Sequence, residues 1–210
     1  GVLRTDGKEN LITSVEIAAA KRNGAGMVPE VCIFFDSRLF RGNRAVKRDA
    51  DQFSAFHSVN YPPLAVAGID IRYNAEYIHY PAERGIFKIH TNFNNNVAVL
   101  KIFPGINNQV FSAVLNIPGL KGVVIETFGA GNVPTSPWLV RCIKDAIKRN
   151  IVILNITQCE GGGVLMGHYE TSVELVKAGV VSGKDMTSEA AVTKMMFLLG
   201  QGLSTNEVKM

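Results

Sequence analysis

From Val97 onward, short apolar runs alternate with stretches whose apolar residues recur every three to four positions. This alternation is typical of βαβ units, which build a parallel sheet covered by helices. We predict strands over residues 97–103, 122–127 and 151–156. Helices are predicted over residues 107–115, from Ser136-Pro137 onward, over 169–177 and over 187–200. The sequence therefore predicts a compact α/β domain over residues 94–210.

The first ninety residues are less regular. An apolar helical stripe precedes Asn23-Gly24 and consists of Leu11, Val15, Ala18 and Ala19. Residues 31–35 predict a buried strand of a parallel sheet, and residues 36–51 a polar, cationic loop. The Pro62-Pro63 pair and short alternating segments follow, up to the break at residues 94–96. We expect the end of one domain over residues 1–60, an interdomain linker over 61–93 and a second domain over 94–210.

The composition is that of a globular protein, with 47% apolar residues and 19% charged residues. Lys and Arg number 22 against 18 Asp and Glu, which leaves a net charge of +4. A nucleic-acid-binding protein usually concentrates its positive charge, so this balance is a weak argument for such a partner and we expect none. Since no apolar run reaches the roughly 18 residues of a membrane span, we expect a soluble protein with no membrane partner.

Neither cysteines nor histidines form a metal pattern. The three cysteines, Cys32, Cys142 and Cys159, lack CxxC spacing and are too scattered for a disulfide framework, which favours a reducing compartment. His57, His79 and His90 show neither the HxH nor the i,i+4 spacing of a zinc site. We therefore predict no metal site and no cofactor.

Polar segments follow the predicted strands, where ligands bind in open parallel sheets. In the segment after residue 35, positive side chains recur every three residues, at Arg38, Arg41, Arg44 and Lys47. The segment fits a solvated loop or a phosphate-binding patch. A third interpretation needs only Lys47, because a partly desolvated lysine loses its preference for the charged form and can accept a proton.

The segment after residue 127 is rich in glycine. Gly129 and Gly131 form a GxG, but Pro134 replaces the third glycine of a dinucleotide loop and no acidic residue follows at the expected distance. The glycines fit an ordinary turn before a helix. They also fit a backbone that approaches a small ligand, to which Asn132 offers both a donor and an acceptor.

The segment after residue 156 contains Cys159, which could act as a nucleophile only beside a base. His168 stands ahead of a helix and is not placed near Cys159 by any motif. Packing or structural roles are the simpler interpretation for both residues.

Seven segments resemble, in order, successive motifs of the cytoplasmic type I L-asparaginases. They are RTDGKENL (4–11), RGNRAVK (41–47), NYPPLAVAGI (60–69), ETFGAGN (126–132), NITQC (155–159), MGHYET (166–171) and AGVVSGKDMTSEAA (178–191). The resemblance covers nearly the whole chain. It implies the end of a flavodoxin-like catalytic domain over residues 1–60, followed by the linker and the smaller C-terminal α/β domain.

The resemblance also implies an activity, the hydrolysis of L-asparagine to L-aspartate and ammonia, in a cytoplasmic homodimer or homotetramer. In this family one threonine attacks the side-chain amide, and a second threonine, a lysine and an aspartate relay protons. Lys47 matches the family lysine at the end of RGNRAVK. Asn132 matches a position that a neighbouring subunit sends toward the backbone groups of the substrate.

Two motifs of the family are missing from these 210 residues. Family members begin with a Thr-Gly-Gly-Thr segment that supplies the nucleophile, and a later Gly-Thr-Asp-Thr segment supplies the second threonine and the aspartate. We therefore expect a C-terminal fragment that is inactive alone, whose unpaired apolar strand edge favours association. The alternative is a non-catalytic small-molecule binding or regulatory module. The gene sequence upstream of Gly1 would distinguish the two.

A further difference concerns regulation. Some bacterial members bind asparagine at an allosteric pocket through a threonine just before the relay lysine and an arginine at the end of the strand that here contains residues 123–125. This sequence has Val46 and Glu126 at those positions. Because a carboxylate repels the carboxylate of the ligand, we predict no asparagine allostery of that design.

Overall fold

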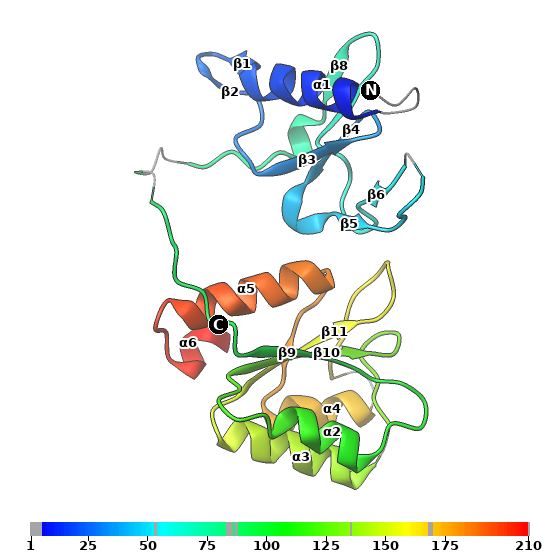
Figure 1. Cartoon of the computed structure of the whole chain (residues 1–210), viewed down its shortest axis with the longest axis vertical. Coiled ribbons are helices and arrows are strands. Elements are labelled where there is room, and N and C mark those ends of the chain that lie inside the picture. Colours follow the sequence, from blue (N-terminus) through cyan, green and yellow to red (C-terminus); the bar gives the residue numbers. More distant parts are fainter. Residues whose placement is uncertain are drawn as a thin grey trace. The chain divides into compact units, whose positions relative to one another are not determined.

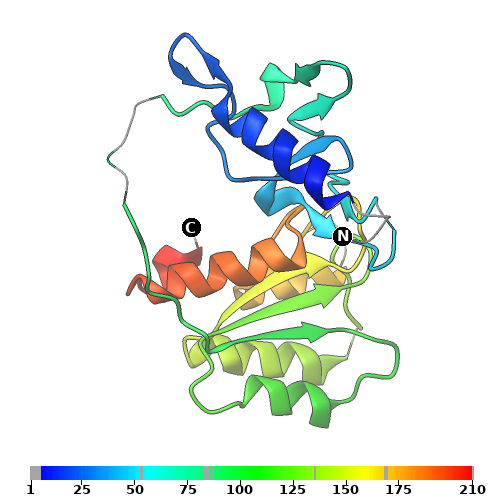
Figure 2. The same cartoon turned by 45° about the horizontal axis from the view of Figure 1, so that its top comes forward.

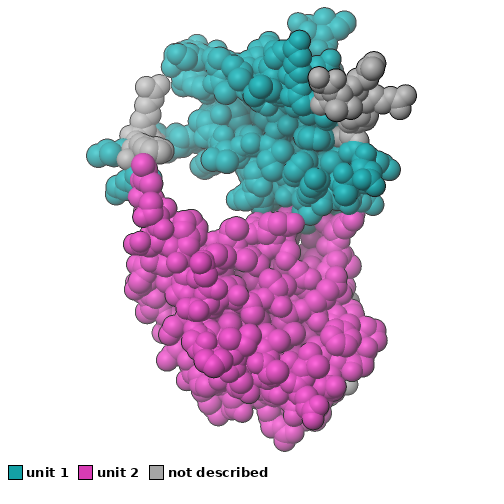
Figure 3. All heavy atoms as spheres, in the orientation of Figure 1, with its two compact units in different colours: residues 1–88 teal, residues 89–210 magenta. Residues whose placement is uncertain are grey.

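The chain forms two compact units, residues 1–88 and 89–210 (Figure 3). The computed structural model describes residues 6–52, 54–82, 86, 88–134, 136–167 and 170–209. None of the helices in these ranges combines the length and the apolar character needed to cross a membrane.

A four-stranded parallel sheet forms the centre of the second unit, with the strand order β12-β11-β10-β9 (Figure 1). Its strands are β9 (Val97–Lys101), β10 (Gly122–Thr127), β11 (Val152–Thr157) and β12 (Val181–Ser182). Its helices are α2 (Asn108–Leu115), α3 (Pro137–Lys148), α4 (Glu170–Ala178), α5 (Ser188–Gly200) and α6 (Thr205–Lys209). This confirms the predicted α/β fold and parallel sheet, with β10 at the predicted bounds.

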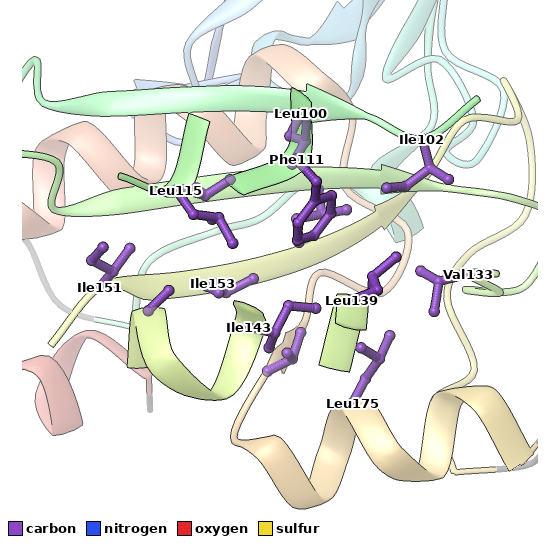
Figure 4. Packing of buried hydrophobic residues seen from close by; sticks show 14 of the residues in the cluster. Leu100, Ile102, Phe111, Leu115, Val133, Leu139, Ile143, Ile151, Ile153 and Leu175 are labelled. Carbon is purple, nitrogen blue, oxygen red and sulfur yellow. The ribbon is translucent and has the colours of Figure 1, made fainter. Parts of the chain in front are cut away.

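Helices cover both faces of this sheet, with α2, α3 and α4 on one face and α5 and α6 on the other (Figures 1 and 2). Successive side chains of a strand point to opposite faces. Val123 and Ile153 accordingly pack in the cluster that includes Phe111 and Ile143, shown in Figure 4. Val124 packs instead in the cluster beside α5. Burial on both faces explains why β10 and β11 read as nearly continuous apolar runs.

The helix boundaries follow from their caps. The Asn107 side chain accepts a 3.0 Å hydrogen bond from the N–H of Val110 and starts α2. Thr187 caps α5 in the same way, through a 3.2 Å bond from the N–H of Ala190. Ser136 occupies the predicted N-cap position of α3 but its side chain makes no capping bond, and Pro137 begins the helix.

The first unit is built mainly from antiparallel strands. Its helix is α1 (Gly7–Ala19), and its four-stranded sheet has the order β3-β4-β7-β8. Those strands are β3 (Cys32–Phe35), β4 (Arg38–Arg41), β7 (Ala65–Ala67) and β8 (Ile71–Tyr73). Two short hairpins complete it, β1 (Lys21–Arg22) with β2 (Ala25–Gly26) and β5 (Val46–Lys47) with β6 (Phe56–His57). The 3₁₀ turns are η1 (Gly42–Arg44) and η2 (Ala75–Tyr77).

Part of the segment predicted as a polar loop is a strand. β4 pairs antiparallel with β3 through a turn at Asp36 and Ser37, whose φ angles are +48° and +61°. Leu39 and Phe40 are buried although charged residues flank them. β3 itself is half-buried rather than fully buried, and it forms one edge of the sheet as far as the structure describes the unit.

The predicted stripe of α1 faces the solvent, which corrects the sequence interpretation. Leu11 is 66% exposed and Val15 60% exposed, whereas Ile17 on another face is buried. Ile17 packs with Leu39 and Leu64 in the core of the first unit. The apolar stripe of α1 therefore has no packing role within the described part of this chain.

The segment predicted as an interdomain linker, residues 61–93, contains β7, β8 and η2. Leu64 and Ala65 are completely buried, and Ile78 is buried as well. These three side chains pack in the core of the first unit. The first unit extends to residue 88, so most of the segment predicted as a linker belongs to it.

Candidate functional site

A short hairpin follows β10 at the carboxyl end of the second unit's sheet, where ligands bind in open α/β sheets. Phe128 and Asn132 form an isolated antiparallel bridge, with N···O distances of 3.0 and 2.8 Å. Gly129 and Gly131 have φ angles of +49° and +112°, which residues other than glycine rarely adopt. The turn thus places the half-buried Asn132 beside the end of β10.

Two neighbouring segments hold the tip of this hairpin. The Thr157 hydroxyl donates a 2.7 Å hydrogen bond to the carbonyl of Gly129. The Leu165 N–H donates a 3.0 Å bond to the carbonyl of Ala130. The Thr157 hydroxyl also accepts a 3.0 Å bond from the N–H of Cys159, so it joins the loops that follow β10 and β11.

A buried pair of polar side chains also contacts this hairpin. Thr127 and Asn155 are both 0% exposed, and the Thr127 hydroxyl donates a 2.7 Å bond to Asn155 Oδ1. Asn155 Nδ2 in turn donates a long 3.5 Å bond to the carbonyl of Gly131. Sequence analysis missed this pair, although an asparagine inside the apolar run of β11 is a signal, because buried polar side chains need partners.

Glu126 lies at the end of β10 beside the first turn of α5. Its Oε1 accepts a 2.6 Å hydrogen bond from the hydroxyl of Ser188, the first residue of that helix. The N-terminus of a helix favours a negative charge. The carboxylate predicted to exclude an allosteric asparagine is therefore already engaged with α5.

Lys47 lies in β5, where it pairs with Phe56 of β6. The Phe56 ring packs on Phe35, with ring centroids 5.2 Å apart, so the backbone of Lys47 is well anchored. Its side chain is exposed and takes part in none of the hydrogen bonds or ion pairs among the described residues. Lys47 is therefore not desolvated in the chain as it stands, and its role as a proton acceptor stays a prediction.

The first unit contains a cavity of about 680 Å³ lined by Glu30, Arg41 and Tyr61, among others. The Arg41 guanidinium forms a two-point ion pair with Glu30, and its carbon lies 4.4 Å from the centre of the Tyr61 ring. Burial alone would raise the pKa of the Glu30 carboxyl. The bonds from Arg41 and from the N–H of His79 outweigh it and hold that pKa below its usual range.

The cysteines differ in their surroundings. Burial, aided by the Glu30 carboxylate and opposed by Arg41, raises the pKa of the Cys32 thiol to about 11. Cys159 is exposed, and His168 lies outside the described residues. In the ranges that the structure covers, no three His, Cys, Asp or Glu side chains gather in a group that could hold a metal ion.

Lys47 and Asn132, the two predicted site residues, belong to different units, and neither unit brings them together by itself. The second unit offers a rigid hairpin with an amide side chain, suited to binding a polar ligand. The first offers a flexible amine that can exchange a proton once it is desolvated.

Two family models match the chain. The first, glutaminase/asparaginase C-terminal domain, matches residues 96–210, and the second, asparaginase N-terminal, matches residues 1–79. The crystal structure of L-asparaginase I from Vibrio cholerae superposes with a TM-score of 0.90 and 41% identity, covering 99% of this chain and 61% of that one.

Curated relatives carry different names. L-asparaginase 1 of Escherichia coli K12 is 39% identical over 207 residues, which are 99% of this chain and 59% of the relative. The 60 kDa lysophospholipase of Mus musculus is 42% identical over 208 residues, which are 99% of this chain and 36% of the relative. The chain thus spans about three fifths of the asparaginase and about a third of the lysophospholipase. The chain belongs to the glutaminase/asparaginase family.

Proposed function

We propose that this chain is the C-terminal part of an L-asparaginase, an amidohydrolase that converts L-asparagine and water to L-aspartate and ammonia. The observation that carries the proposal is the family match over both units, and the RGNRAVK and ETFGAGN segments, which contain Lys47 and Asn132, support it. The proposed setting is a cytoplasmic homodimer or homotetramer.

In the proposed reaction, a threonine hydroxyl outside this chain attacks the side-chain amide carbon of asparagine. The new C–O bond forms and the C–N bond breaks, so that ammonia leaves and an aspartyl ester remains. Water then cleaves the ester and returns the hydroxyl. Lys47 accepts the proton of the attacking hydroxyl, because a threonine is a poor nucleophile until a base takes that proton. The same proton then passes to the amide nitrogen, which leaves as ammonia.

The solvent exposure of Lys47 gives the proposal a specific requirement. A lysine accepts a proton only in its neutral form, which burial favours. The polypeptide that carries the threonine therefore has to cover Lys47 in the complete enzyme. The same requirement means that the 210-residue chain alone does not turn over asparagine.

A hybrid enzyme tests the proposal. It joins this chain to the part of E. coli L-asparaginase 1 that carries the two threonine motifs, and ammonia release is measured for the hybrid, for the chain alone and for hybrid Lys47→Met. We expect turnover only by the unmodified hybrid, with kcat of Lys47→Met reduced at least about a hundredfold. Lys148→Met, a change on the exposed side of α3, is the control. Near-normal turnover by Lys47→Met would remove Lys47 from the mechanism.

The second candidate is the non-catalytic binding module, favoured by the rigid polar hairpin at the sheet edge. Calorimetric titration of the chain alone with L-asparagine separates the two. If the chain alone binds asparagine and the hybrid shows no turnover, the two results together favour the binding module. Because some relatives are named lysophospholipases, lysophosphatidylcholine is tested as a substrate in parallel.

A further inference from the structure

The hairpin that carries Asn132 is held through its backbone carbonyls. Four successive carbonyls accept hydrogen bonds, and each bond comes from a different donor. The donors are Thr157 Oγ1 to residue 129 (2.7 Å), Leu165 N to residue 130 (3.0 Å), Asn155 Nδ2 to residue 131 (3.5 Å) and Phe128 N to residue 132 (3.0 Å). A turn with its carbonyls fixed in this way holds the backbone of Asn132, its last residue, in one orientation.

The shortest of these bonds comes from the one donor that also joins a second loop. The Thr157 hydroxyl donates to the carbonyl of Gly129 and accepts from the N–H of Cys159. Thr157 is half-buried at the end of β11, directly opposite Thr127 in the parallel register. Its side chain therefore couples the position of the hairpin tip to the rigid end of the sheet.

Close packing on the other side of the hairpin restricts its movement. A Cβ at residue 131 would lie 2.7 Å from Val164 Cγ1 and 3.3 Å from Asn155 Nδ2. The segment of Val164 is itself anchored, because its N–H donates a 2.9 Å bond to the carbonyl of Lys184. The hairpin is thus held by Thr157 at Gly129 and by Val164 at Gly131.

We propose that Thr157 is a positioning residue for Asn132: its hydroxyl fixes the 128–132 hairpin so that the Asn132 amide meets the backbone groups of the substrate. The inference rests on the proposed function, in which Asn132 contacts asparagine. In this role Thr157 acts through Asn132 and needs no contact with the substrate. It acts by removing the conformational freedom that Asn132 would otherwise lose on binding.

The test uses the hybrid enzyme with Thr157→Val, Thr157→Ser and Asn132→Ala. Valine keeps the shape of threonine but loses the hydroxyl, and serine keeps the hydroxyl. We expect Thr157→Val to raise KM about three- to tenfold with kcat little changed, and Thr157→Ser to restore the wild-type KM. Thr193→Val is the matched control, because its hydroxyl also donates a 2.7 Å bond to a backbone carbonyl, that of Glu189.

A double mutant distinguishes positioning from general stability. If Thr157 acts through Asn132, Thr157→Val has no further effect on KM in the Asn132→Ala background. Additive effects on KM would overturn the proposal. So would a normal KM for Thr157→Val beside a raised KM for Asn132→Ala, which leaves the proposed function intact. A normal KM for Asn132→Ala would overturn both the proposed role of Asn132 and the positioning role that depends on it.

A second measurement needs no turnover. In the 210-residue chain, we expect Thr157→Val to speed hydrogen exchange of the backbone N–H of Asn132. Thr157→Ser should leave this exchange slow. Exchange that is equally slow in the wild type and in Thr157→Val would show that the hydroxyl does not hold the hairpin and would overturn the proposal.

Discussion

The Thr127 hydroxyl donates a 2.7 Å hydrogen bond to Asn155 Oδ1, and neither side chain is exposed to solvent. Asn155→Ala removes this acceptor and opens a cavity between β10 and β11. We expect the free energy of unfolding of the second unit to fall by about 1–3 kcal/mol. Trp138, the chain's one tryptophan, packs edge-on against Phe111 and reports this transition by fluorescence during urea unfolding.

Gln109→Ala is the control for this change, because Gln109 is exposed on α2. An Asn155→Ala midpoint equal to that of the control would show that the buried pair contributes no stability.

The two glycines of the 128–132 hairpin offer a matched comparison. A Cβ at Gly131 would contact Val164 at 2.7 Å, whereas a Cβ at Gly129 would have nothing within 4 Å. Both substitutions place alanine at a positive φ, which costs about 1–2 kcal/mol each. The additional clash should make Gly131→Ala clearly less stable than Gly129→Ala, measured again by Trp138 fluorescence. Equal midpoints for the two variants would contradict the packing of Val164 against the hairpin.

The parallel sheet of the second unit could be predicted because strands buried on both faces appear in the sequence as nearly continuous apolar runs. β10 occupies the predicted residues, and β11 is shifted by one residue. Gly and Pro punctuate the segments between them. The antiparallel hairpin β3–β4 was missed because Asp36-Ser37 adopts positive φ without the Asn-Gly or Asp-Gly pair that signals such turns.

The predicted stripe of α1 was wrong for a different reason. Leu11 and Val15 satisfy helical periodicity, but the small core of the first unit buries a single helix residue, Ile17. Periodicity identifies an apolar face without showing which surface covers it.

The candidate site could be predicted only in part. The resemblance to asparaginases supplied the roles proposed for Lys47 and Asn132. Thr157 escaped notice because its partner is a backbone carbonyl in a loop 28 residues away, and no local pattern records such a contact. Asn155 was missed although an asparagine within the apolar run of β11 is a signal of a buried polar pair.

The ion pair between Glu30 and Arg41 makes the first unit sensitive to acid. The pKa of the folded Glu30 carboxyl lies below its unfolded value of about 4.3, so its stabilisation is complete above that pH and is lost as pH falls through the folded pKa. We expect stability of the first unit to decline below about pH 4.5 and Glu30→Gln to flatten this dependence. Near-UV circular dichroism of its tyrosines, which include Tyr61 and Tyr77, follows the unfolding.

Glu76→Gln is the control, since Glu76 lines the same cavity but forms no ion pair with Arg41 in the part of the chain that the structure describes. An unchanged acid dependence in Glu30→Gln would assign the effect to other carboxylates.

Cys32 and Cys159 should differ in reactivity. With a pKa of about 11, only about one Cys32 thiol in a thousand is ionised at pH 8, and the residue is half-buried. We expect iodoacetamide to alkylate the exposed Cys159 much faster, as read from peptide masses over time. The unfolded chain in urea is the control, in which all three cysteines react alike. Equal rates in the folded chain would contradict the burial of Cys32.

The last prediction concerns allostery. Glu126 already accepts a 2.6 Å bond from Ser188 at the start of α5, and its negative charge repels the carboxylate of an asparagine bound there. We expect the hybrid enzyme to saturate hyperbolically, with a Hill coefficient of about 1, and Glu126→Gln to leave the shape of the curve unchanged. The measurement is initial rate against asparagine concentration, with Ser188→Ala as the control that removes the hydrogen bond but keeps the charge. Sigmoidal saturation that disappears in Glu126→Gln would show that asparagine regulates the enzyme through this carboxylate.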